Sequence, residues 1–253
     1  MHSAPLAHDP NSLAPQGAPA APPSGSSIPA LQGTREEARW PLALLAVLAP
    51  ILLITLFMTP AGRLNWLLET GPGLIGIAAL AATFRRFPMS RWVYVCVFLH
   101  VLVLTYGAYY TYALTPLGNW ARDSFELSRN PYDRLGHFVQ GFFPAFIIRE
   151  VLLRVTPLRR GGWLNFLTGS VALAISAFYE FLEWWAALAL DPEGGDKFLG
   201  SQGDIWDAQW DMFMCLCGAT LALVLFARAH YRSIERLVAR GTPQGAPRER
   251  AAQ

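Results

Sequence analysis

The stretch that decides the fold is residues 92–114, which read WVYVCVFLHVLVLTYGAYYTYAL and contain no Asp, Glu, Lys or Arg. A helix of this length spans about 34 Å, enough to cross the roughly 30 Å hydrocarbon core of a bilayer. Together with five similar blocks it gives six expected spans: Pro41–Met58, Leu64–Phe84, Trp92–Leu114, Leu135–Leu153, Trp163–Leu190 and Gln209–Ala227. Apolar residues make up 53% of the chain and charged residues 15%, against roughly 25% charged in soluble domains. We therefore expect an all-α, polytopic membrane helix bundle of about six transmembrane helices.

The two ends of the chain differ in composition from this bundle. Residues 1–39 are rich in Ala, Pro and Ser and offer few large apolar groups to bury, so we expect a disordered N-terminal tail. This tail contains no early apolar run of the kind that a cleaved signal peptide needs, which predicts that the first apolar helix is retained as an anchor. The bundle is expected over residues 40–228, followed by a basic tail over residues 229–253.

Basic residues are distributed unevenly between the two sides of the expected bundle. One side collects Arg35, Arg39, Arg85, Arg86, Arg91, Arg154, Arg159, Arg160 and the C-terminal arginines, and the other has Arg63, Arg122, Arg129, Arg134 and Lys197. Because cytoplasmic loops carry the excess of Lys and Arg, we expect both termini to be cytoplasmic. The C-terminal basic stretch favours contact with anionic lipid over nucleic-acid binding.

Ionisable residues lie in or beside the apolar spans, where charge is costly and favours a functional role. They occur at helical spacing, which gives each set a common helix face: Asp133 with His137, Glu180 with Glu183, and Asp204 with Asp207 and Asp211. In the expected orientation all three sets lie at the outer ends of their helices. Glu69 joins them if it belongs to the second span, whose first turn Gly71-Pro72-Gly73 could make irregular. The sequence therefore predicts one acidic, His-containing pocket that opens outward.

The composition of this pocket suits a metal ion. Carboxylates with one imidazole are ligands for a divalent ion such as Mg²⁺, Ca²⁺, Mn²⁺ or Zn²⁺. We expect Asp133, His137, Asp204, Asp207 and Asp211 to hold the ion and Glu180 or Glu183 to act as the catalytic general base. The cysteines all fall within apolar spans and indicate no disulfide framework and no soft-metal site: Cys96, Cys215 and Cys217.

Three hypotheses for function remain open. The first is a metal-dependent membrane hydrolase or transferase, or a binding protein, for an amphipathic envelope molecule. The second is a proton- or cation-coupled transporter that uses the same acids, which predicts a water path continuing to Arg149 and Glu150. The third is a structural or assembly protein, in which neighbouring residues neutralise or hydrogen-bond the acids and lock the bundle: Arg134, Lys197, Tyr132 and Gln202.

Three motifs carry a resemblance to known membrane proteins. They are NPYDRLGHFVQGF at 130–142, YEFLEW at 179–184 and FLGSQGDIWDAQWDM at 198–212. With these motifs the chain resembles the YjdF family of bacterial inner-membrane proteins, which implies an inner-membrane location and a multi-pass topology but supplies no reaction. A fainter similarity is to VanZ-like membrane proteins, through Asp133-Arg134 and His137-Phe138, then Glu180 and Glu183, then Asp207 and Asp211 before Gly218, with Asp in place of the Asn of that pattern.

Overall fold

The computed structural model describes residues 28, 31–190 and 201–241, and in these residues the chain forms helices and no strand. The helices are α1 (Arg35–Met58), α2 (Arg63–Thr83), α3 (Arg91–Tyr110), α4 (Pro116–Ser124), α5 (Tyr132–Phe142), α6 (Pro144–Val155), α7 (Gly162–Leu190) and α8 (Asp207–Gly241), with short 3₁₀ turns at Tyr112–Leu114 and Ser201–Gly203. The expected all-α bundle is confirmed. The N-terminal tail, apart from residue 28 and the residues from 31 on, lies outside the described residues, as does Lys197.

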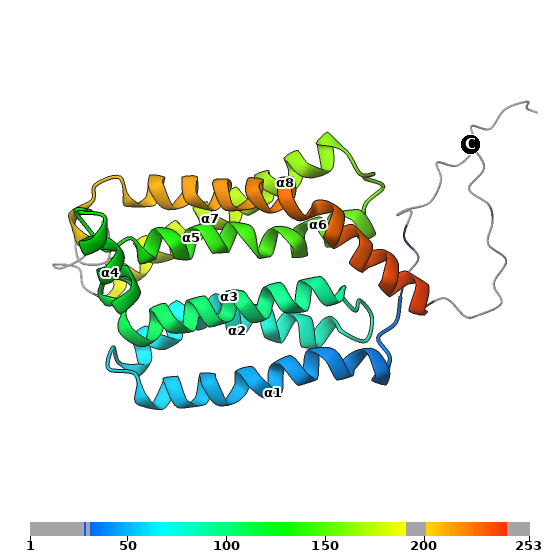
Figure 1. Cartoon of the computed structure of the whole chain (residues 1–253), viewed down its shortest axis with the longest axis horizontal. Coiled ribbons are helices and arrows are strands. Elements are labelled where there is room, and N and C mark those ends of the chain that lie inside the picture. Colours follow the sequence, from blue (N-terminus) through cyan, green and yellow to red (C-terminus); the bar gives the residue numbers. More distant parts are fainter. Residues whose placement is uncertain (1–27, 29–30, 191–200, 242–253) are drawn as a thin grey trace, which may run out of the picture.

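The helices run back and forth between two ends of the bundle, as Figure 1 shows. We call them the α4 end, where α4 lies and α5 and α8 begin, and the α6 end, where α6 finishes and α1 begins. Within the described residues, five helices are long and apolar enough to cross a membrane: α1, α2, α3, α7 and α8. The remaining pass is made by α5 and α6 together.

This remaining pass was expected as one span over Leu135–Leu153, but the helix is divided at Pro144. Proline has no backbone N–H to donate and its ring crowds the preceding turn, so the regular hydrogen-bond ladder is interrupted there. Phe143 keeps helical dihedral angles, with φ −77° and ψ −47°. As a result α6 continues in the direction of α5 (Figure 1), and the pass is a broken helix rather than a turn.

Other helix ends follow from local sequence. α1 begins at Arg35, six residues before the expected span, because Thr34 and Glu37 form a reciprocal capping box at its N-terminus. α2 runs through Pro72 without a break, so Glu69 lies within this helix. α8 continues to Gly241, which makes the first part of the expected basic tail a helical extension of the last pass.

Large apolar side chains cover much of the outside of the bundle. Examples from four helices are Phe57 at 64% exposure, Ile75 at 71%, Phe166 at 62% and Val224 at 73%. A soluble monomer rarely exposes such extensive apolar surface, whereas a bilayer solvates it. The exposure pattern therefore supports a membrane environment.

α5 and α8 pack with their backbones in contact, at Gly141 and Gly218. A Cβ atom on Gly141 would clash with the carbonyl oxygen of Cys215, and one on Gly218 would clash with that of Phe138. Small residues permit this close approach between membrane helices. Since His137 lies one turn before Gly141, and Asp211 two turns before Gly218, the contact brings these two polar residues together.

An aromatic core lies along α5 and α6 towards the α6 end. Phe142 packs edge-on against Phe146 with ring centroids 6.0 Å apart, and Trp92 packs edge-on against the same Phe146 at 5.6 Å. Phe226 of α8 lies 5.8 Å from Phe142, and buried Ala145, Cys215 and Ala219 fill the space between the helices. This apolar layer separates the polar residues at the α4 end from those at the α6 end.

Candidate functional site

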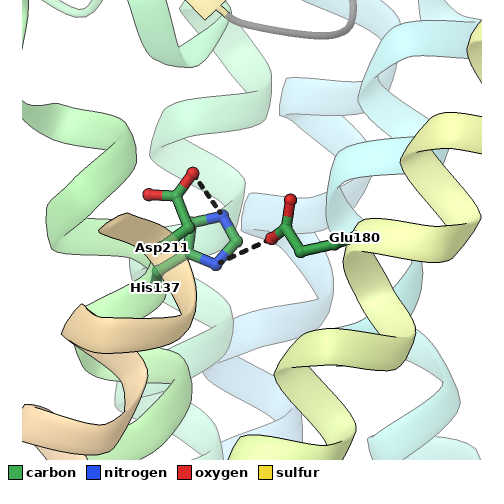
Figure 2. Close-up of side chains that lie close together, drawn as sticks. All are labelled: His137, Glu180 and Asp211. Carbon is green, nitrogen blue, oxygen red and sulfur yellow. Dashed lines mark ion pairs between the residues drawn. The ribbon is translucent and has the colours of Figure 1, made fainter. Parts of the chain in front are cut away.

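The centre of the candidate site is His137 on α5, which lies between acidic residues of two other helices. Its Nδ1 is 3.8 Å from Oε1 of Glu180 on α7, and its Nε2 is 3.8 Å from Oδ2 of Asp211 on α8. Figure 2 shows the imidazole between the two carboxylates. One ligand atom from each of the three residues can be chosen so that all three lie within 4.8 Å of one another. Three passes thus converge on a space the size of one coordination sphere.

His137 and Asp211 are buried and Glu180 is partly buried, and each has a polar atom without a partner among the described residues. His137 is 5% exposed and Asp211 is 2% exposed. Nδ1 of His137, Oε1 of Glu180 and Oδ1 of Asp211 have no hydrogen-bond partner in the described part of the chain. A separation of 3.8 Å is too long for a hydrogen bond, and buried polar atoms in native proteins are normally paired. The three residues therefore form a ligand set that is not satisfied by the protein itself.

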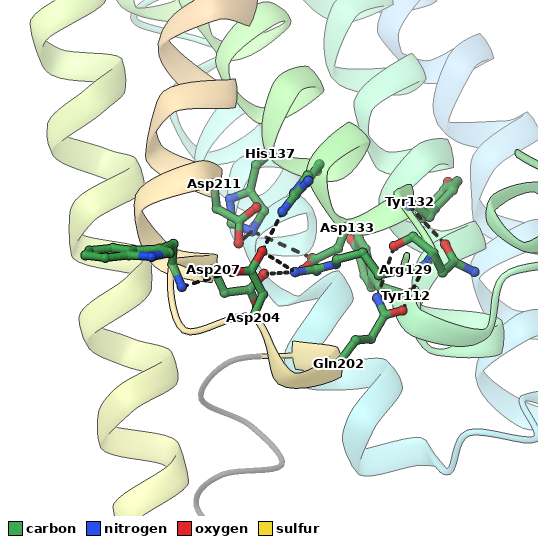
Figure 3. Close-up of polar contacts among 12 residues, drawn as sticks. Tyr112, Arg129, Tyr132, Asp133, His137, Gln202, Asp204, Asp207 and Asp211 are labelled. Atoms are coloured by element: carbon green, nitrogen blue, oxygen red, sulfur yellow. Dashed lines mark hydrogen bonds and ion pairs between the residues drawn. The ribbon is translucent and has the colours of Figure 1, made fainter. Parts of the chain in front are cut away.

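The other three predicted metal ligands, Asp133, Asp204 and Asp207, lie beside this set and are paired with arginine, and Oδ1 of Asp133 is also 3.8 Å from Nε2 of His137. Arg129, in the segment before α5, forms ion pairs with Asp207, with Asp133 at 3.3 Å and with Asp204 at 3.4 Å. Arg134 pairs with Asp204 at 2.6 Å, and its guanidinium lies 5.0 Å from the ring centre of Trp210. Figure 3 shows Arg129 among these carboxylates. Asp133, Asp207 and Asp211 also have ligand atoms within 4.8 Å of one another, so Asp211 links the arginine-paired acids to His137.

Asp204 lies before α8 and Arg129 lies before α5, and the pKa values of both side chains follow from their contacts. The N–H of Trp206, with Arg134 and Arg129, lowers the pKa of the Asp204 carboxyl. Burial by itself lowers the pKa of Arg129, but the hydrogen bond and the charge of Asp207 outweigh it, so the pKa is raised. Both groups are therefore held in their charged forms.

Two loop residues fix the register of α5 and α8 at this end. The Gln202 side chain pairs with the backbone of Asn130, accepting from its N–H at 2.8 Å and donating to its C=O at 3.0 Å. Asn130 is fully buried; its Oδ1 accepts the N–H of Tyr132 at 3.0 Å, and its Nδ2 donates to the C=O of Thr115 at 3.1 Å. The first and third sequence motifs thus clamp the starts of both helices beside α4.

The remaining acids lie next to the cluster rather than in it. Glu183 is one turn further along α7, towards the α4 end, and interacts electrostatically with Glu180 and Asp133. Glu69 of α2 accepts a hydrogen bond from Asn65 at 2.9 Å through one oxygen, while its other oxygen is buried and has no partner in the ranges that the structure describes. Of the two general-base candidates, Glu180 is therefore part of the ligand set and Glu183 borders it.

Sequence reasoning missed two contributors. Arg129 was assigned only to the outer loops, although its position four residues before Asp133 indicates that they can pair. Tyr179 was also missed; its ring centre is 6.2 Å from that of His137. Adjacent residues of a helix point in different directions, so the position of Tyr179 next to Glu180 does not predict its contact with His137, and nothing in its own spacing distinguishes it from a packing residue.

Comparisons with known proteins place the chain in a family. It is 46% identical over 191 residues to the inner membrane protein YjdF of Escherichia coli (strain K12), a match that covers 76% of this chain and 91% of that protein. This similarity, with the apolar helices, supports a multi-pass inner-membrane location. No solved structure matches the chain. A family model described as "Predicted membrane protein (DUF2238)" matches residues 41–232, which include α5, α7, the first part of α8 and all the site residues. The chain therefore belongs to the DUF2238 family of predicted membrane proteins, which confirms the resemblance found in its motifs.

Proposed function

We propose that this protein binds a divalent cation through His137, Glu180 and Asp211, and that the site recognises or acts on an amphipathic molecule of the cell envelope. The observation that carries the proposal is that His137, Glu180 and Asp211, on three helices, can each bring one ligand atom within 4.8 Å of the others. Each of the three also has a buried polar atom without a hydrogen-bond partner in the described part of the chain. An ion with ligand distances of roughly 2 to 2.6 Å could bind all three after small side-chain movements.

The charge distribution supports a cation at this position. Arg129 and Arg134 offset the charge of Asp133, Asp204 and Asp207. Glu180 and Asp211 have no arginine or lysine within ion-pair distance in the described ranges. Carboxylates held close together away from solvent repel one another unless they share protons, pair with a cationic side chain or bind a cation. A divalent ion would neutralise the pair.

The donor atoms narrow the choice of ion. Imidazole nitrogen suits Zn²⁺ and related transition metals, whereas carboxylate oxygen suits Mg²⁺, Ca²⁺ and Mn²⁺. A set with one nitrogen and two carboxylates favours Mn²⁺ or Zn²⁺ within the group expected from the sequence. If the protein is an enzyme, the ion would polarise a substrate oxygen or a water molecule, and Glu183 would accept a proton as general base.

The transport hypothesis has less support. It requires a polar path from His137 to Arg149 and Glu150, but the aromatic layer around Phe142 and Phe146 lies between them. In this layer of the described chain, His100 is an ionisable residue with a buried, unpartnered Nε2, and its ring packs against Phe143 at 6.1 Å. The layer around His100 is thus mainly aromatic and aliphatic, which gives little support to a continuous polar relay.

The scaffold hypothesis explains one half of the cluster. The ion pairs of Arg129 and Arg134 form a network that can lock α5 to the start of α8. A network that serves packing alone is expected to be satisfied throughout, because unpaired buried groups destabilise the fold. His137, Glu180 and Asp211 do not meet this expectation, which favours a ligand.

The proposal is tested by thermal unfolding of purified protein in Mg²⁺, Ca²⁺, Mn²⁺ and Zn²⁺. A bound ion at about 100 times its Kd stabilises the folded state by about 2.7 kcal/mol. We expect Mn²⁺ or Zn²⁺ to stabilise the wild type and the Glu183→Gln variant, but not Glu180→Gln. A deletion strain complemented by each variant provides the functional readout. If no ion stabilises the wild type and Glu180→Gln complements fully, the proposal is wrong.

A further inference from the structure

A second buried polar cluster lies at the α6 end and plays no part in the proposed metal site. Its members belong to α6 and α8 and have almost no solvent exposure: Arg149 at 3%, Glu150 at 0%, Arg154 at 7% and His230 at 0%. The cluster contains two arginines and one carboxylate. Its charge balance therefore depends on which of its groups are paired and on the protonation of His230.

Glu150 is fully engaged within this cluster. Its Oε1 accepts the N–H of Ser90, at the start of α3, at 2.8 Å and Nη1 of Arg154 at 3.0 Å, and its Oε2 lies 3.1 Å from Nε2 of His230. Arg154 also donates to the C=O of Pro88 at 2.6 Å. The negative charge of Glu150 is thus matched by Arg154, and these two residues hold α6 against the start of α3.

Hydrogen-bond chemistry assigns the tautomer of His230. Nη1 of Arg149 lies 3.2 Å from Nδ1 of His230. A guanidinium can only donate hydrogen bonds, so Nδ1 accepts and carries no hydrogen. The hydrogen is then on Nε2, which donates to Oε2 of Glu150. His230 is therefore neutral in this arrangement.

The cluster consequently holds an unbalanced positive charge. Arg149 and Arg154 contribute two positive charges, Glu150 contributes one negative charge, and His230 contributes none. Nε of Arg149 has no hydrogen-bond partner among the described residues. A buried charge without a counter-charge destabilises a protein strongly, so the arrangement indicates that an anion completes it.

Arg160 extends this positive charge to the surface. It is exposed in the segment between α6 and α7, its guanidinium lies 4.0 Å from the ring centre of Tyr231, and it repels Arg149 electrostatically. Tyr231 is the neighbour of His230 on α8 and also interacts with Arg149. The two guanidinium groups lie at different depths of the α6 end, and an anion bound between them would relieve their mutual repulsion.

We propose that Arg149 and Arg160 bind the phosphate of an anionic phospholipid headgroup at the α6 end. Guanidinium groups match phosphate geometry and bind it through paired, charge-assisted hydrogen bonds. The excess of basic residues predicts that this end faces the cytoplasm, where anionic lipids attract basic segments. Free phosphate offers the same chemistry without the acyl chains, so the test must separate the two sources.

The test compares thermal unfolding of the full chain in phosphatidylcholine bilayers as phosphatidylglycerol is titrated in. The variants are Arg149→Gln, which keeps a donor for His230, and Arg160→Gln, which changes only an exposed residue. The matched control is Arg232→Gln, which changes an exposed arginine on α8. A separate series adds inorganic phosphate to protein in phosphatidylcholine alone.

We expect phosphatidylglycerol to raise the Tm of the wild type and of Arg232→Gln by about 3 °C or more, and to have less than half this effect on either site variant. In phosphatidylcholine alone, Arg149→Gln should be at least as stable as the wild type, because it removes the unbalanced charge. A response to phosphatidylglycerol but not to phosphate identifies a lipid, and an equal response to phosphate identifies a free anion; either supports the anion site. Equal responses of all four proteins to phosphatidylglycerol, or no response of the wild type to either anion, would overturn it.

Discussion

Gly218→Ala tests the helix contact that assembles the site. The added methyl group would clash with the backbone carbonyl of Phe138, which cannot rotate away as a flexible side chain could. α5 and α8 must then separate locally, and overpacking of this kind costs about 1–3 kcal/mol. For a protein of this size that corresponds to a fall in Tm of about 2–12 °C. Because Asp211 lies two turns from Gly218 on the same face of α8, we also expect weaker metal-dependent stabilisation.

The matched control is Gly76→Ala in α2, where an added Cβ atom has nothing within 4 Å. Alanine favours helix over glycine by up to about 1 kcal/mol, so this variant should unfold at the wild-type temperature or above it. Thermal unfolding in detergent, monitored by circular dichroism, measures both variants under identical conditions. If Gly218→Ala is as stable as Gly76→Ala, the close packing of α5 on α8 is not what positions the site.

Three further predictions concern the arginine network and the orientation. Arg129→Gln leaves buried carboxylates without their counter-charge and should destabilise the protein by roughly 3–5 kcal/mol. The control Arg122→Gln, at an exposed ion pair, should destabilise it by about 1 kcal/mol or less, and chemical denaturation measures both variants. The N–H of Trp206 and two arginines lower the pKa of Asp204 from its ordinary value of 3.8, so its charge stabilises the fold above that pH. The difference in stability between the wild type and Asp204→Asn should therefore be constant near neutral pH and disappear in acid as the folded-state pKa is passed. In a background without the native cysteines, a cysteine at position 122 should react with an impermeant thiol reagent added outside intact cells, and a cysteine at position 240 should not. The reverse labelling pattern would mean that the expected topology is inverted.

Much of the fold could be predicted because it depends on local composition. Apolar blocks of membrane-spanning length fixed the number of passes, and alternating direction then placed three polar sets at the same end. The break at Pro144 was missed, since the block from Leu135 to Leu153 satisfies length and hydropathy whether or not its helix is continuous. A proline within such a block was the available signal for it.

The membership of the site could not be predicted to the same degree. Glu180 and Glu183 are three residues apart and share a helix face, so spacing alone does not decide which one meets His137; the rotation of α7 against α5 decides it. The pairing of Arg129 with Asp207 joins residues far apart in the sequence through the fold of two loops. The depth of each polar side chain in the membrane thus follows from local sequence. Which of these side chains contact His137 depends on helix rotation and on loop contacts.

The pairing of His230 with Glu150 illustrates the same limit at the α6 end. Their contact joins α8 to α6 across 80 positions of sequence. In the structure Glu150 is paired with Arg154 and His230, whereas Arg149 has no carboxylate of its own among the described residues. The charge imbalance becomes visible only when all partners are placed.

The central claim is that His137, Glu180 and Asp211 hold a metal ion, and metal content measures it most directly. Protein purified in detergent, loaded with Mn²⁺ or Zn²⁺ and freed of excess ion, is analysed by elemental mass spectrometry. We predict about one ion per chain in the wild type and in the control Asp123→Asn, an exposed acid outside the site, and at least a tenfold lower content in Asp211→Asn and Glu180→Gln. Equal metal content in all four proteins, or none in the wild type, would contradict the claim.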